Sequence, residues 1–306
     1  FARDLEMFSF VLTQADAMPL GVGAIAGTTL PIDRDLTRSL LGFTRMTSNG
    51  LDTVGDRDFG LDYAYAASRC LIHAGRMSAD LVDFSSSEFG LVKLGSALAC
   101  GSSLMPQKRN PDLFEVVRAY SSQSIAGIVW LLSLVKGLPT GYSRDLQGER
   151  PVILKTRGIV GSVLQALHVA LPEISFDYER CRQAVEEDYL QATDLAEGLV
   201  TRGIPFRTAY QAVGSLVKRL QEAHRPLATL TLEEAQAAHP AFDRELLVLA
   251  SIEGAVARRE SAGGTGPESV KHQIADLERR AQAAKDRARE IPRLGSLFES
   301  LREAPL

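Results

Sequence analysis

The most informative stretch of this 306-residue chain is Gly101-Ser102-Ser103-Leu104-Met105-Pro106-Gln107-Lys108-Arg109-Asn110-Pro111-Asp112. It combines a flexible glycine, two hydroxyl groups and a cation in one loop. Asn110 and Pro111 are typical of the N-cap and the first residue of a helix, because asparagine accepts hydrogen bonds from free backbone N–H groups and proline needs no donor there. A long helix is therefore predicted to follow the loop, with its positive end near Lys108.

Helical spacing dominates the sequence around this loop. After Leu113, apolar and small side chains recur every three or four residues, at Val116, Val117, Tyr120, Ser124, Gly127, Ile128, Leu131, Leu132 and Val135. Glycine and proline within residues 137–139 are predicted to end this helix. Other long helices are predicted at residues 1–17, 59–84 and 151–172. Long amphipathic helices without alternating strand patterns predict an all-α fold built on a long-helix bundle.

Beyond Ser175 the predicted helices become shorter, at residues 178–190, 192–202 and 208–224. Gly203 is typical of the position just after a helix C-cap. Thr265 and Glu268 have the spacing of a capping box, which predicts that a last helix starts there. We expect a central helical-bundle domain, residues 1–185, that carries the loop and is incomplete at its N-terminus. A small C-terminal helical domain, residues 186–306, is expected to follow.

Composition narrows the class of protein. The chain is 45% hydrophobic and 24% charged with a net charge of −4, and its basic residues are not clustered, which argues against nucleic acid as a partner. Cys70, Cys100 and Cys181 have neither disulfide-framework nor metal-ligand spacing. We find no signal peptide and no apolar run long enough to span a bilayer, and so predict a cytoplasmic location without a membrane partner.

The residues of the loop alone leave two interpretations open. Ser102 and Ser103 could act as a base if their pKa were lowered by Lys108, but adjacent serines after a glycine are also typical of a simple turn. Lys108 has an alternative interpretation as a surface lysine. Glu115 falls in the first turn of the predicted helix, where the helix dipole favours a carboxylate whatever its function.

The loop resembles the signature loop of the fumarase/aspartase superfamily, Gly-Ser-Ser-x-x-Met-Pro-x-Lys-x-Asn-Pro, with one residue fewer before Met105. Its Gln107 and Asp112 are similar to those of the argininosuccinate lyase family. Further stretches similar to that family follow the same order along the chain, at residues 19–28, 56–59, 137–139, 142–147, 192–195, 204–207 and 263–265. The resemblance covers nearly the whole chain.

The resemblance implies a homotetrameric C–N lyase that converts argininosuccinate to arginine and fumarate by β-elimination, with no cofactor and no metal. It implies that Ser102 removes the Cβ proton, that Lys108 and Asn110 stabilise the resulting negative charge, and that Glu115 orients a histidine acting as general acid. It also implies that the substrate is held by Ser103, Met105, Tyr142, Gln147 and Arg150, where the family usually has lysine at the last position.

The chain begins at Phe1 inside a predicted helix. Compared with the family, we therefore expect it to lack an N-terminal part that carries the catalytic histidine and a substrate-holding Thr-Ser stretch. Residues 1–306 alone are accordingly expected to be inactive. Two alternatives stay open from the sequence: another lyase of the superfamily, of the adenylosuccinate lyase or fumarase type, or a structural relative that keeps the fold without catalysis.

Overall fold

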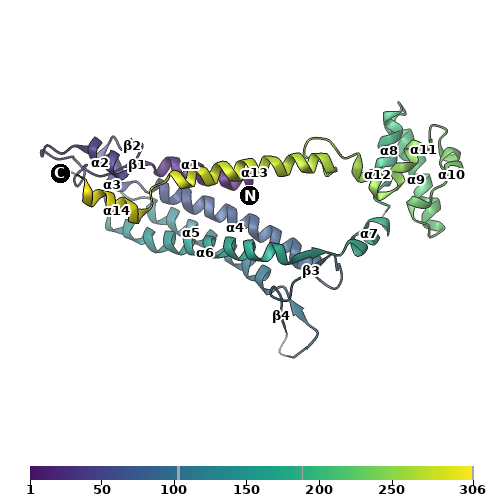
Figure 1. Ribbon diagram of the computed structural model, residues 1–306, viewed down its shortest axis with the longest axis horizontal. Helices are drawn as coiled ribbons and strands as arrows, with labels where there is room; N and C mark the ends of the chain where they lie inside the picture. The colour runs from purple at the N-terminus through teal and green to yellow at the C-terminus, as the bar shows by residue number, and fades with distance from the viewer. Residues whose placement is uncertain (102–103, 188, 305–306) are drawn as a thin grey trace. The chain divides into compact units, whose positions relative to one another are not determined.

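The computed structural model describes residues 1–101, 104–187 and 189–304 and is predominantly helical (Figure 1). The chain forms two compact units: residues 1–89, 94–175 and 279–306 make the first, and residues 90–93 and 176–278 make the second. The predicted all-α class is confirmed. The division into domains at residues 1–185 and 186–306 stays a prediction, because these units describe packing within one chain rather than independent folding.

Three long helices form the body of the first unit: α4 (Asp58–Phe84), α5 (Asp112–Val135) and α6 (Glu149–Ala170). The buried positions of α4 recur every three or four residues, at Ala64, Ala67, Leu71, Ala74, Ser78 and Leu81. Small residues let the helices approach closely. A Cβ atom on Gly60 would lie 2.8 Å from the Cδ1 atom of Ile153 of α6, so a larger residue there would require the Ile153 side chain to shift.

The apolar stripe of α5 is wider than the surface that this chain covers. Phe114, Val117 and Leu131 are buried. Val116 and Leu132, which the sequence places on the same stripe, are each 50% exposed. Packing against α4 and α6 therefore uses only part of the predicted stripe, and an apolar face of α5 stays uncovered within the described chain.

Helix α1 (Ala2–Ala15) packs on α4 through a buried carboxylate. Asp4 is 3% exposed and accepts a hydrogen bond of 3.2 Å from Nε of Arg69, while its other oxygen lies 2.8 Å from Nδ1 of His73. Because a buried charge needs partners, this cluster accounts for the position of His73 within the bundle. The later half of α13 (Pro267–Glu290) joins the same unit, since Arg280 pairs with Glu6 of α1 at 2.6 Å.

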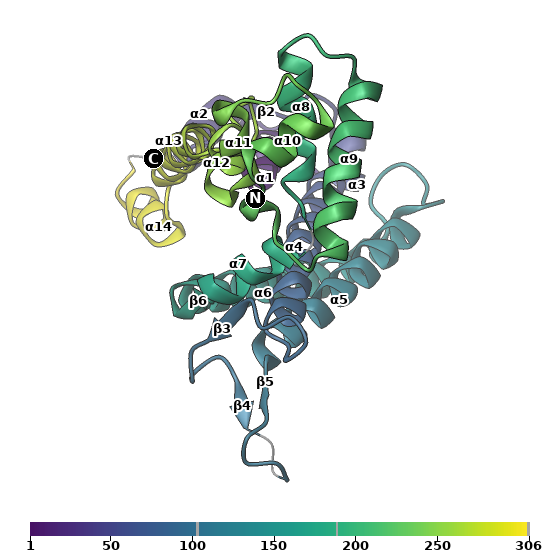
Figure 2. The same cartoon turned by 90° about the vertical axis from the view of Figure 1, so that its right-hand side faces the viewer.

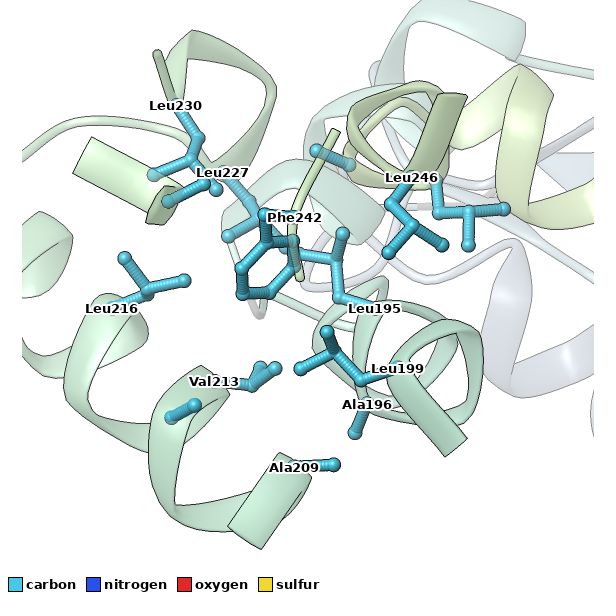
Figure 3. Packing of buried hydrophobic residues seen from close by; sticks show 14 of the residues in the cluster. Leu195, Ala196, Leu199, Ala209, Val213, Leu216, Leu227, Leu230, Phe242 and Leu246 are labelled. Carbon is cyan, nitrogen blue, oxygen red and sulfur yellow. The ribbon is translucent and has the colours of Figure 1, made fainter. Parts of the chain in front are cut away.

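The core of the second unit is a single apolar cluster (Figure 3). The ring of Phe242 lies among Leu195, Leu216 and Leu227, and all four side chains are fully buried. The cluster is built mainly from α8 (Ala192–Thr201) and α9 (Phe206–Glu222). The remaining elements of this unit are α7 (Tyr178–Glu187), η3 (Leu227–Thr229), α10 (Leu232–Ala238), α11 (Arg244–Leu247), η4 (Val248–Ala250) and α12 (Ile252–Ala257).

Gly203 ends α8 as predicted. It has φ +86°, and its N–H donates to the Val200 carbonyl at 2.9 Å, while the N–H of Ile204 donates to the Leu199 carbonyl at 3.2 Å. This pair of bonds is a Schellman motif, which needs a left-handed residue and so favours glycine. Ile204 packs against the core cluster, as the motif requires of the following residue.

The start of α13 differs from the predicted capping box at Thr265. The helix begins at Pro267, and its free backbone N–H groups at Glu268 and Ser269 donate to the carboxylate of Glu260 at 3.1 and 2.7 Å. The carboxylate of Glu260, eight or nine residues earlier in the chain, thus accepts the hydrogen bonds of the free N–H groups that a capping box would otherwise satisfy. The box that the structure contains is at α10, between Thr231 and Glu234.

Short elements complete the chain. β1 (Ala17–Met18) pairs in parallel with β2 (Arg45–Met46), and β4 (Cys100–Gly101) pairs antiparallel with β5 (Arg109–Asn110). β3 (Val92–Leu94) pairs with β6 (Ile174–Phe176). The other short helices of the first unit are α2 (Arg34–Leu41), α3 (Gly50–Gly55), η1 (Arg144–Gly148), η2 (Leu171–Glu173) and α14 (Leu294–Glu303).

One expectation about membranes is corrected. Residues 144–173, which include α6, are long and apolar enough to cross a membrane by length and composition alone. Only 22% of the apolar window is buried in the chain, because one side of α6 packs on α4 and α5 and the other is uncovered. A bundle helix that is apolar on two faces has the same length and composition as a membrane-spanning helix. Composition alone therefore does not distinguish the two.

Candidate functional site

The signature loop forms the connection of a two-stranded hairpin. Cys100 pairs with Asn110 and Gly101 with Arg109, and the hairpin extends beyond the ends of the bundle helices (Figures 1 and 2). Ser102 and Ser103, the predicted base and its neighbour, lie outside the described residues. The predicted role of each serine therefore stays a prediction.

The described residues of the loop lie at the surface. Leu104 is 85% exposed and Met105 is 38% exposed. The backbone N–H of Lys108 donates to the Met105 carbonyl at 3.1 Å, which closes a turn and fixes the backbone that carries this lysine. Lys108 is exposed, so within this chain its ammonium group is available to a ligand.

The N-terminus of α5 lies directly after the hairpin, one residue later than predicted. Pro111 is the N-cap and Asp112 the first helical residue, because Asn110 has extended backbone in the hairpin pairing. The prediction of Asn110 as N-cap is therefore wrong by one position. Glu115 lies in the first turn and is exposed, while fully buried Phe114 anchors this end of the helix in the bundle.

A thiol links the hairpin to the helix. Cys100 is exposed, and a hydrogen bond to the Asp112 carboxylate, together with the negative charge of that carboxylate, raises the pKa of the thiol. A raised pKa keeps the group as a neutral thiol at neutral pH, which is the opposite of what a nucleophilic cysteine needs. We interpret Cys100 as a structural contact that ties β4 to the start of α5.

The second predicted part of the site lies in the connection between α5 and α6. Tyr142 is 52% exposed, and Nε2 of Gln147 donates to its hydroxyl at 2.9 Å, so the structure brings these two predicted residues together. Leu146 between them is buried and anchors the short η1 helix. Helix α6 begins at Glu149 rather than at Pro151 as predicted. Arg150 therefore lies in its first turn, and its side chain is exposed.

An ion pair between Arg57 and Glu149 holds the end of this connection, where α6 begins. Nε of Arg57 lies 2.5 Å from Oε2 of Glu149, and both side chains are about four-fifths buried. Neither of these two atoms forms a hydrogen bond with the described residues, so the contact is an ion pair. Burial raises the pKa of Glu149, and the Arg57 guanidinium opposes that change. Burial also raises the pKa of Asp58, and the neighbouring carboxylates, first among them Asp56, raise it further.

Two cavities open at the connection between α5 and α6, and Tyr142 lines one of them. One, of about 640 Å³, is lined by Ala24, Ile25, Val54, Thr140, Gly141 and Tyr142. The other has a volume of about 370 Å³. One side is lined by the acidic stretch that contains Asp52, Asp56 and Asp58, and the other by Val135, Leu138, Pro139, Thr140, Gly141 and Leu146. Stretches far apart in the sequence thus meet at this end of the first unit. Among the described residues, no group of histidine, cysteine, aspartate or glutamate side chains is arranged to hold a metal ion.

Sequence reasoning missed Thr140 and Gly141 at this site. Gly141 has φ +92° and is buried, and a Cβ atom added to the nearby Gly55 would lie 2.7 Å from its carbonyl oxygen. The backbone here approaches the α3 end closely, which is what places Tyr142 beside the cavity. A glycine directly before a predicted binding tyrosine was the available signal.

The two parts of the predicted site do not meet within one chain. The hairpin directly precedes the N-terminal end of α5, and Tyr142 follows seven residues after its C-terminal end at Val135. The 24 residues of α5 rise about 36 Å, which is several times the length of any side chain. Lys108 and Glu115 are therefore together at one end, and Tyr142, Gln147 and Arg150 are together at the other.

Comparison with known proteins relates the chain to lyases over most of its length. Residues 1–126 match the family described as Lyase, and residues 189–257 match the family described as Argininosuccinate lyase C-terminal. The chain is 42% identical over 277 residues to the argininosuccinate lyase of Thermus thermophilus and 41% identical over 275 residues to that of Synechocystis sp.. Each alignment covers 90% of this chain and 60% of the relative.

A solved structure shares the fold along the whole chain. EDDS lyase in complex with formate is 25% identical, with a TM-score of 0.79, and the match covers 99% of this chain and 63% of that chain. The chain therefore spans about three-fifths of the length of the curated relatives and of this solved structure.

Proposed function

The chain is a homologue of the argininosuccinate lyases over nine-tenths of its length, and from this premise we propose that it supplies the serine loop and the amino-acid-binding segment of an argininosuccinate lyase. The proposed reaction is a β-elimination that releases arginine and fumarate. The observation that carries the proposal is the identity of 42% over 277 residues, which includes both predicted parts of the site.

The chemistry assigned to the loop begins with proton removal. Ser102 takes the Cβ proton of the succinyl group, the electron pair moves into the neighbouring carboxylate, and the resulting aci-carboxylate carries more negative charge than the substrate does. Lys108, exposed beside the loop, and Asn110 are proposed to bind that added charge more strongly than they bind the substrate. The intermediate then collapses with cleavage of the C–N bond.

The leaving nitrogen needs a proton as the bond breaks. We propose that Glu115, in the first turn of α5, orients a histidine that donates this proton. Ser103 and Met105 are proposed to hold the fumarate half of the substrate. Tyr142, Gln147 and Arg150 are proposed to hold the amino-acid half, where the guanidinium of Arg150 offers two donors to a carboxylate.

The separation of the two parts along α5 supports a site shared between copies. A single chain holds them about 36 Å apart, whereas an assembly in which the long helices of several copies pack together can bring the hairpin of one copy to the Tyr142 end of another. We therefore propose a homotetramer, in which each site draws on more than one subunit.

The uncovered faces of the bundle helices support this assembly. Val129 and Trp130 of α5 and Leu154 of α6 are 57%, 45% and 52% exposed. An apolar groove of about 350 Å³ between α5 and α6 is lined by Asp112, Leu113, Val116, Val117, Tyr120, Ser162, Val163 and Ala166. Helices of other copies would bury these side chains and complete the bundle.

No cofactor, metal, nucleic acid or membrane forms part of the proposal. One proton passes from the substrate to Ser102 and another from the histidine to the leaving nitrogen, which also takes the electron pair of the C–N bond, so no oxidation or reduction occurs and no redox group is needed. The cysteines are free thiols in the described structure, which fits the reducing conditions of the cytoplasm, and we propose that location for the enzyme.

The proposed substrate is tested by an assay of the enzyme produced from its complete gene. Argininosuccinate, adenylosuccinate and malate are supplied separately, and fumarate release is followed in the ultraviolet. Of the three substrates, we expect only argininosuccinate to be turned over, because Tyr142, Gln147 and Arg150 are proposed to select its amino-acid half. Turnover of adenylosuccinate or malate instead would assign the chain to another chemistry of the superfamily, and no turnover with any substrate would favour a structural protein.

A further inference from the structure

A separate cavity lies wholly within the second unit, and none of its lining residues belongs to either part of the proposed active site. Its volume is about 480 Å³, and it is bounded by α8, by η4, by the end of α12 and by the loop before α13. The lining side chains include Asp194, Glu197, Arg258, Arg259 and Thr265. The cavity thus contains two acidic and two basic groups.

One wall of the cavity is fixed by an ion pair between the buried carboxylate of Asp194 and the half-exposed side chain of Arg259. The side chain of Asp194 is 8% exposed, and Nη2 of Arg259 lies 2.9 Å from each of its two oxygens. The glycine-rich loop opposite is held tightly, because the N–H of Gly266 donates to the Arg259 carbonyl at 2.8 Å and that of Gly264 to the Ser261 carbonyl at 2.7 Å. A Cβ atom on Gly264 would lie 2.2 Å from the Arg259 carbonyl oxygen, so this wall requires glycine.

The other two charges that line the cavity, on Arg258 and Glu197, lie on exposed side chains. Among the described residues, neither the guanidinium of Arg258 nor the carboxylate of Glu197 forms an ion pair, although both line the same cavity. Thr265 lines the same cavity, is exposed, and its hydroxyl forms no hydrogen bond within the described part of the chain. The cavity therefore presents one unpaired cation, one unpaired anion and a hydroxyl against a rigid wall.

We propose that this cavity binds a free α-amino acid. The carboxylate of the ligand pairs with Arg258, its ammonium group pairs with Glu197, and Thr265 contributes a hydrogen bond. A zwitterion satisfies both charges at once, whereas a simple anion or cation would leave one lining charge facing a group of the same sign. The proposal stands on this cavity and does not depend on the proposed lyase activity.

The test is calorimetric titration of the whole chain with each standard α-amino acid, followed by the methyl ester and the Nα-acetyl derivative of any that binds. We expect at least one amino acid to bind saturably, and we expect each derivative, which lacks one of the two charges, to bind at least tenfold more weakly. Arg258→Gln and Glu197→Gln are each expected to weaken binding by about tenfold. The matched controls Arg207→Gln and Glu233→Gln change exposed charges of the same unit outside the cavity and are expected to leave it unchanged.

Two results would overturn the proposal. One is the absence of saturable binding for every amino acid with the unaltered chain, which does not depend on how any variant folds. The other is binding that persists in both cavity variants but is lost in a variant that carries Gln147→Ala and Arg150→Ala, which would assign the ligand to the proposed active site. Fumarate release is measured separately, so failure here leaves the lyase proposal intact, and the reverse also holds.

Discussion

Replacement of Ser102 by alanine is expected to lower kcat by about a hundredfold or more in the enzyme produced from its complete gene, because the reaction loses its positioned base. The substitution removes one hydroxyl from a loop whose described neighbours, Gly101 and Leu104, are exposed. Substrate affinity and assembly state are expected to change little. The measurements are steady-state fumarate release, substrate affinity and sedimentation of the purified variant.

Ser103→Ala is the matched control for this prediction. It removes a hydroxyl from the same loop and is expected to affect KM more than kcat, since that serine is proposed to hold substrate. The opposite pattern, with Ser103→Ala inactive and Ser102→Ala close to normal, would assign the base to the neighbouring hydroxyl.

A second large effect is expected at the far end of α5. Gln147→Ala combined with Arg150→Ala should weaken argininosuccinate binding by about a hundredfold, since two hydrogen-bonded contacts to a charged group are lost. Both side chains are exposed, so the melting temperature should stay nearly unchanged. Substrate affinity and thermal unfolding are measured on the same preparation.

The control for the double variant uses the same connection. Arg144→Ala combined with Asp145→Ala removes two exposed charges from η1 without touching the proposed contacts. This control is expected to keep normal affinity. Equal loss of affinity and stability in the Gln147 and Arg150 variant would instead make the connection a structural element.

The long helices could be predicted from the sequence because apolar residues recur at the three- to four-residue spacing of the buried face of a helix. The predicted helix at residues 59–84 differs from α4 by one residue, since every third or fourth position of that stretch faces the bundle. Helix starts were less predictable. The cap of α13 comes from Glu260, a carboxylate outside the helix, and no local pattern around Thr265 identifies it.

The composition of the candidate site followed from the sequence, but its geometry did not. Motif resemblance places Lys108 beside the serine loop and Gln147 beside Tyr142, and the structure brings the latter pair together. The separation of the two groups was available from the length of α5, which the sequence predicted nearly in full. The contact of Gly141 with the α3 end depends on tertiary packing, and the glycine before Tyr142 indicates a special backbone position without identifying α3 as its partner.

The central claim is that the serine loop and the Tyr142 connection meet only between copies of the chain, and mixing two inactive variants tests it most directly. One variant carries Ser102→Ala and the other carries Gln147→Ala with Arg150→Ala, each in the enzyme produced from its complete gene. The two are refolded separately and as an equal mixture, and fumarate release from argininosuccinate is measured.

The account predicts little activity from either variant and recovery in the mixture. If each site takes its loop from one copy and its connection from another, about a quarter of the sites in randomly mixed assemblies unite two intact segments. The mixture should then show about a quarter of normal turnover, with the substrate affinity of the unaltered enzyme. A mixture no more active than its components, in samples shown by sedimentation to contain mixed assemblies, would contradict the shared site.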